Sequence, residues 1–147
     1  MTKTELKELL DSLTIEEKAG QLTQVNYLYF EKDGMVTGDT NIHMPSRRFT
    51  DAEMHNIGSI FNVFNREKLI KIQEEHLRHN KIPLLFMADI EWGHFVFVPT
   101  ALGQSATFDT ELIEQISKEA AEQASMNGIK VTFSPQADLA RDARWGR

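Results

Sequence analysis

Apolar residues along this chain alternate between helical spacing and short continuous runs, which predicts helices interleaved with strands. Leu6, Leu9 and Leu10 recur at helical spacing in residues 4–12, and Ala19, Leu22 and Val25 do so in a second predicted helix. Longer helices are predicted over residues 66–80 and from about 110 to 127, and a short one near residues 50–56. Short β-prone or apolar runs predict strands at residues 59–64, 84–88 and 129–133.

Polar residues at the ends of these segments predict where the helices begin and stop. Thr14 with Glu17, and Thr50 with Glu53, have the spacing of a capping box, in which a hydroxyl and a carboxylate satisfy backbone N–H groups. Asp109 or Thr110 is expected to cap the last long helix, and the pair at residues 127–128 (NG) to end it.

The order of elements predicts an α/β fold with about three parallel strands after N-terminal helices. Residues 84–88 are apolar without alternation, which is typical of a strand buried on both faces. Two long loops are expected, at residues 27–49 and 89–103. Asp89 and Asp138 each follow a predicted strand, at the sheet edge where such folds place their working residues.

Composition limits the function classes. The 147 residues carry 16 basic and 22 acidic side chains, a net charge of −6, which disfavours nucleic acid as a partner. No stretch approaches the length of a membrane span, and the charged N-terminus does not resemble a signal peptide. The chain has no cysteine, so disulfides and thiolate metal sites are excluded. We expect a single domain in the cytoplasm.

The densest polar cluster is residues 89–94 (DIEWGH). Asp89 and Glu91 could form an acid–base pair, or Asp89 could accept hydrogen bonds from sugar hydroxyls while Trp92 covers an apolar ring face. The alternative is that Asp89 only caps the loop and Trp92 packs on the rim of the sheet.

Two other polar groups have both a functional and a structural interpretation. In the tail, residues 138–147 (DLARDARWGR), the arginines could clamp hydroxyls or a carboxylate, or Arg141 and Asp142 could form an ion pair that stiffens the loop. His76 and His79 share a helix face and could hold a metal ion, but no third ligand completes a motif, so a solvated face is favoured. The sequence therefore predicts no metal site and no cofactor.

Three segments of the sequence are similar to a known family: residues 13–18 (LTIEEK) with Gln21, residues 82–89 (IPLLFMAD), and residues 133–147 (FSPQADLARDARWGR). They resemble the N-terminal domain of family 3 glycoside hydrolases, of the bacterial β-glucosidase type. The resemblance implies part of a (β/α)₈ barrel and retaining hydrolysis of β-linked glucosides. It also implies that Asp89 binds sugar hydroxyls together with an arginine of the last motif, Arg147 in the first place and Arg144 in the second.

The sequence departs from the family pattern in two respects. The family reads Asp-x-x-His-Gly where this chain has Trp92 before Gly93, with Glu91 at a commonly aliphatic position. A barrel also needs roughly 250 residues, and the family's aspartate nucleophile and glutamate acid/base correspond to sequence beyond Arg147. We therefore expect an N-terminal fragment with little or no activity of its own.

About three strands leave two open sheet edges, so we expect self-association or a complementary barrel fragment as partner. The alternative function is that of a non-catalytic, self-assembling α/β scaffold, or an engineered half-barrel. In that case Trp92, Phe95 and Phe97 would suit an interface, where aromatic residues are enriched.

Overall fold

The computed structural model describes residues 1–27, 53, 55–137, 139 and 141–144. Its centre is a parallel sheet of four strands in the order β1-β2-β3-β4, which is also their order along the chain. The strands are β1 (Gln24–Asn26), β2 (Ser59–Phe61), β3 (Leu85–Ala88) and β4 (Val131–Thr132). Parallel neighbours that are consecutive along the chain, with helices between β2 and β3 and between β3 and β4, are the arrangement of a (β/α) barrel wall.

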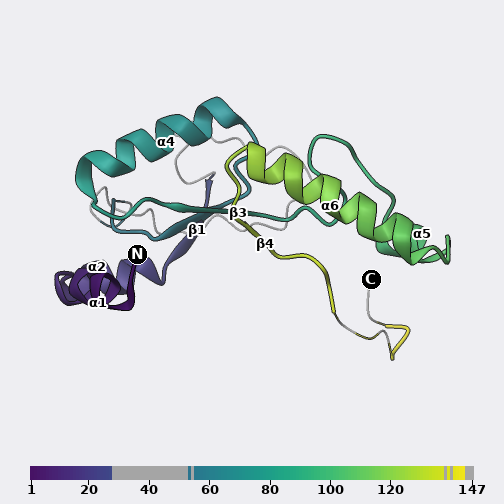
Figure 1. Cartoon of the computed structure of the whole chain (residues 1–147), viewed down its shortest axis with the longest axis horizontal. Coiled ribbons are helices and arrows are strands. Elements are labelled where there is room, and N and C mark those ends of the chain that lie inside the picture. The colour runs from purple at the N-terminus through teal and green to yellow at the C-terminus, as the bar shows by residue number, and fades with distance from the viewer. Residues whose placement is uncertain (28–52, 54, 138, 140, 145–147) are drawn as a thin grey trace.

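Among the described residues, two helices precede the first strand and three more lie between later strands. α1 (Lys3–Asp11) and α2 (Ile15–Gln21) come before β1, α4 (Arg66–His79) connects β2 to β3, and α5 (Ala101–Ser105) and α6 (Thr110–Met126) lie between β3 and β4. Figure 1 shows α4 and α6 on one side of the sheet, and α1 and α2 together at the end of the sheet where β1 begins. None of the described helices is long and apolar enough to cross a membrane.

The predicted caps are present where the structure describes them. Thr14 and Glu17 form both hydrogen bonds of a capping box at α2. Asp109, not Thr110, caps α6, accepting a hydrogen bond from the Leu112 N–H at 2.9 Å. Gly128 follows α6 with φ of +99°, a conformation that favours glycine. The pair predicted at Thr50 and Glu53 lies largely outside the described residues.

Two boundary predictions are wrong. The second helix ends at Gln21, and Val25 belongs to β1, because the backbone of residues 24–26 pairs with that of 59–61. Pairing with a neighbouring strand thus overrides a helical spacing that rested on three apolar residues. In addition, α5 occupies part of the predicted loop 89–103.

The core lies between the sheet and the helices packed on it. One buried cluster joins β1, β2, β3 and α4, and its members are Val25, Ile57, Ile60, Val63, Leu69, Leu84 and Phe86. A second joins the end of β3 to α6 and the start of β4: Ala88, Ile90, Ala124 and Ile129. These clusters fix the carboxyl ends of β2 and β3, from which Asn62 and Asp89 project.

β3 differs from the prediction of burial on both faces. Phe86 and Ala88 are buried, whereas Leu85 is 39% exposed and Met87 is half-buried. Alternate residues of a strand point to opposite faces, so only one face of β3 is fully covered. In the (β/α)₈ barrel that the family resemblance implies, this less covered face would line the interior.

Candidate glycone site

Asp89 directly follows β3 and is joined to Asn62, which directly follows the neighbouring strand β2. The Asp89 N–H donates to Asn62 Oδ1 at 3.1 Å, and Asn62 Nδ2 donates to Asp89 Oδ2 at 3.4 Å. Asn62 has φ of +65°, and its own N–H donates to the Met87 carbonyl at 2.9 Å. Asparagine tolerates this left-handed conformation better than most residues do. The two side chains therefore hold each other in place at the carboxyl edge of the sheet.

A pocket of about 530 Å³ opens beside this pair. Its lining comes from the residues after β2 and from the loop after β3: Asn62, Phe64, Asp89, Trp92, Gly93, His94, Phe95 and Phe97. The volume suits a small organic ligand such as a monosaccharide. Among the described lining residues Asp89 is the sole acid, and Glu91 is not one of them.

Most aromatic side chains of the pocket come from one turn and are here called the aromatic wall: Trp92, His94, Phe95 and Phe97. Backbone hydrogen bonds hold this turn in shape. The Val98 N–H donates to the Trp92 carbonyl at 2.9 Å, and Gly93 and Phe97 form an antiparallel bridge. Gly93 has φ of +89°, and a Cβ there would lie 1.9 Å from the Val96 carbonyl oxygen. The turn therefore requires glycine at this position. It leaves Trp92 half exposed and Phe97 largely exposed.

α6 anchors the same turn through one side chain. Gln123 Oε1 accepts hydrogen bonds from the N–H groups of Phe95 and Val96, at 3.1 and 3.3 Å. This contact spans 27–28 residues of sequence and fixes where the aromatic side chains stand relative to Asp89. Nothing in the local sequence of α6 indicates this role for Gln123.

His94 lies between Phe64 and Phe95, with ring centroids 5.8 and 4.4 Å away. Both of its ring nitrogens are buried and have no hydrogen-bond partner among the described residues. Burial lowers the pKa of His94, so the ring is neutral at pH 7. His94 therefore belongs to the aromatic wall and contributes no charge there.

The structure places the other predicted sugar-binding residues as follows. Arg144 is exposed and pairs with Asp142, its Nε donating to Asp142 Oδ1 at 2.9 Å. This interaction lowers the pKa of Asp142 to about 2. Arg147 and Asp138 lie outside the described residues. The roles assigned to Arg144 and Arg147 stay predictions.

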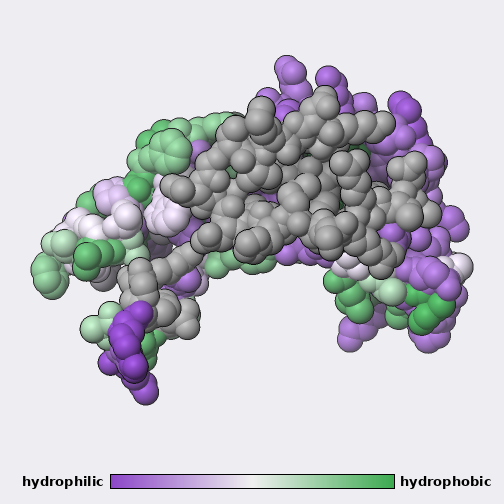
Figure 2. Space-filling view, turned by 180° about the vertical axis from the view of Figure 1, so that it is seen from behind, coloured by the Kyte–Doolittle hydropathy of each residue, from purple (hydrophilic) through white to green (hydrophobic). Residues whose placement is uncertain are grey.

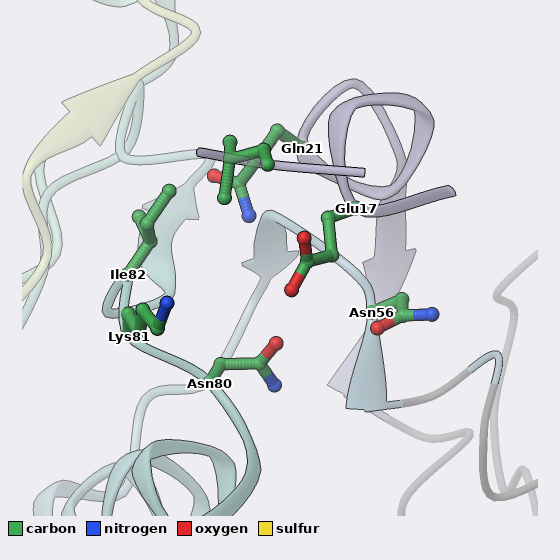
Figure 3. Close-up of a pocket in the computed structure, with 7 residues that line it drawn as sticks. Glu17, Gln21, Asn56, Asn80, Lys81 and Ile82 are labelled. Atoms are coloured by element: carbon green, nitrogen blue, oxygen red, sulfur yellow. The ribbon is translucent and has the colours of Figure 1, made fainter. Parts of the chain in front are cut away.

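A second, smaller pocket lies at the opposite edge of the sheet. It forms among α2, the residues before β2 and the turn after α4, and Figure 3 shows Glu17 and Asn80 pointing toward each other in it. Its volume of about 10 Å³ has room for a water molecule and not for a sugar. The pocket beside Asp89 is therefore the better candidate.

Comparison with known proteins identifies the family. The model of the glycosyl hydrolase family 3 N terminal domain matches residues 14–147. The chain belongs to this family. The predicted partial barrel is thereby confirmed, as is the resemblance noted in the sequence.

Individual relatives agree with this assignment. The chain is 29% identical over 142 residues to the periplasmic beta-glucosidase of Salmonella typhimurium, covering 95% of this chain and 17% of the relative. It is 24% identical over 156 residues to beta-glucosidase C of Emericella nidulans, covering 97% of this chain and 25% of the relative.

Solved structures show the same fold. The beta-glucosidase from Listeria innocua in complex with isofagomine superposes with a TM-score of 0.84 at 35% identity, over 100% of this chain and 20% of that one. The same Listeria protein has also been solved in complex with glucose, at 34% identity. This family 3 chain thus spans about a fifth of the length of its solved relatives.

Proposed function

We propose that this chain provides the glycone-binding part of a β-glucosidase site, with Asp89 accepting hydrogen bonds from sugar hydroxyls. The observation that carries the proposal is the joined Asp89 and Asn62 pair at the wall of the 530 Å³ pocket. A carboxylate accepts strong hydrogen bonds from hydroxyl donors. The aromatic side chains opposite offer an apolar surface for the sugar ring.

We propose further that the hydrolytic step requires carboxylates other than those lining the described pocket. Retaining hydrolysis uses two carboxyl groups roughly 5–5.5 Å apart, one as nucleophile and one as acid/base. The described lining supplies one, Asp89, and its pairing with Asn62 suits binding rather than proton transfer. The share of the relatives' length that the chain spans is consistent with this division of roles.

The test is sugar binding by the purified chain, measured by changes in NMR chemical shifts during titration with glucose and with isofagomine. Asp89→Asn is expected to weaken binding by about tenfold or more, because a charged acceptor is lost. Asp11→Asn is the matched control, since Asp11 is an exposed aspartate of α1. Equal affinity in the Asp89 and Asp11 variants would refute the assignment.

Hydrolysis of an aryl β-glucoside by the same preparation tests the second part. No turnover above the buffer rate is expected. Turnover that Asp89→Asn abolishes would mean that the chain builds a complete catalytic site, and the proposed division of roles would be wrong.

The alternative of a non-catalytic scaffold rests on the exposed aromatic residues of the loop after β3. Phe95 and Phe97 are 64% and 85% exposed, as an interface before assembly would be. Absence of any sugar binding, together with assembly in solution, would favour this alternative.

We also propose that the protein is located in the cytoplasm, and fractionation of the producing cell tests this.

A further inference from the structure

A cluster of metal-ligating side chains lies at the amino-terminal edge of the sheet, opposite the sugar pocket. Its members are His55, in the segment before β2, and Glu75 and His79, four residues apart on α4. One ligand atom from each lies within 4.8 Å of the others. Two imidazoles and a carboxylate are a donor set that Zn²⁺ prefers.

The distances within the cluster suit one tetrahedral ion. Ligands bound to zinc at about 2.0–2.1 Å stand roughly 3.3 Å apart. His79 Nε2 and Glu75 Oε1 are already 3.4 Å apart. The His55 ring is stacked on the His79 ring, with centroids 3.9 Å apart and planes 13° from parallel. Binding to one ion requires one of the two stacked rings to turn so that both ring nitrogens point to the same place, and the rings have room to turn because all three side chains are at least partly exposed.

The backbone around the cluster is fixed by a neighbouring histidine and an asparagine. The buried His76 contacts the Ile82 carbonyl through Nε2 at 3.0 Å, which ties the end of α4 to the turn before β3. Asn80 Nδ2 donates to the carbonyl oxygen of His55. These contacts hold the segment carrying His55 against α4, so little ordering is needed for a metal ion to bind.

We propose that His55, Glu75 and His79 bind a zinc ion, which links the segment before β2 to α4. A solvent molecule would complete the tetrahedron, since the ligands lie at the surface. Arg78 contacts Glu75 Oε2 at 2.9 Å, which leaves Oε1 toward His79 and the metal. The site is separate from the proposed sugar site and does not depend on it.

The experiment is calorimetric titration of the purified chain with zinc chloride, in parallel with NMR of the histidine rings. We expect one saturable site, with the ring signals of His55 and His79 perturbed and those of His94 unchanged. Because an ion bound only to the folded state stabilises it, zinc should also raise the unfolding temperature.

Three variants decide which residues bind. Glu75→Gln and His79→Gln are each expected to weaken zinc binding by about tenfold or more, and Glu74→Gln, a change of the adjacent exposed glutamate, is expected to leave it unaltered. All three positions are exposed on α4, and circular dichroism would verify that the variants fold. Absence of saturable binding to the unmodified chain, or equal binding by all variants, would overturn the proposal. Sugar affinity should be the same with and without zinc.

Discussion

At the scale of single residues, Asn62 has two roles in the candidate site, one through its backbone and one through its side chain. It combines a left-handed backbone with two hydrogen bonds to Asp89. The backbone requirement favours glycine or asparagine, whereas only asparagine also orients the carboxylate. Two substitutions separate these contributions.

Asn62→Gly and Asn62→Ala should both weaken sugar binding, because both remove the amide that orients Asp89. Asn62→Ala should in addition lower the free energy of unfolding, by about 1 kcal/mol more than Asn62→Gly does, since alanine resists a positive φ. Urea unfolding and NMR titration with glucose measure the two effects. Full sugar affinity in Asn62→Gly would show that the amide does not position Asp89.

A second prediction at this scale concerns pH. Burial, chiefly, lowers the pKa of His76 from 6.5, and the adjacent His55 and His79 lower it further, while its hydrogen bond to Ile82 acts in the opposite sense. The folded chain therefore binds a proton less readily than the unfolded chain. The contribution of the neutral His76 ring to the free energy of unfolding should be fully present above pH 6.5. It should decline as the pH falls from there toward the lowered pKa.

Urea unfolding near neutral pH and at a pH below 6.5 tests this decline, and the buried His94 adds to it in the same direction. An NMR titration of the His76 ring should give a midpoint below 6.5. A midpoint at or above that value would contradict the prediction.

At the scale of elements, α6 positions the aromatic wall through Gln123, so its stability matters to the site. Its first turn is capped by Asp109, whose carboxylate accepts from the Leu112 N–H. The N-cap residue of α5 is Thr100, whose side chain makes no capping hydrogen bond. The two helix starts thus form a natural pair of test and control.

Asp109→Ala should lower the free energy of unfolding by about 1 kcal/mol, the usual value of a helix cap. Thr100→Ala should change it far less, because no capping bond is lost. Thermal or urea unfolding measures both. Equal destabilisation by the two substitutions would mean that the carboxylate of Asp109 does not contribute as a cap.

At the scale of the whole molecule, the described sheet leaves two edges and much apolar surface uncovered. Within the described residues β1 pairs with β2 alone, and β4 pairs with β3 alone. Figure 2 shows hydrophobic surface at both ends of the molecule. At the end formed by α1 and α2, the exposed large apolar side chains are those of Met1, Leu6, Leu10, Ile15 and Leu22.

We therefore predict that the purified chain self-associates, unless a complementary fragment of the barrel is supplied. Light scattering should show a mass that rises with concentration. Thr132→Lys, at the exposed edge position of β4, should reduce the association, because edge lysines block strand pairing. A stable, compact monomer at all concentrations would contradict the prediction.

Features whose causes lie within a few residues can be predicted from the sequence. The capping box at Thr14, the cap at Asp109 and the stop at Gly128 depend on contacts between neighbours, so they are visible in the residue order. The parallel α/β class followed from apolar runs alternating with helical spacing. The position of Asp89 after an apolar strand likewise marks it as a candidate site residue in the sequence.

Features that depend on residues far apart in the chain appear only in the folded structure. Val25 became a strand residue by pairing with β2, and Asn62 joined Asp89 across 27 residues. His76, which shares a helix face with His79 in sequence, is buried against Ile82, while His79 meets His55 instead. Such contacts arise where separate elements pack together, because burial and backbone pairing outweigh local spacing, and a one-dimensional pattern does not contain that geometry.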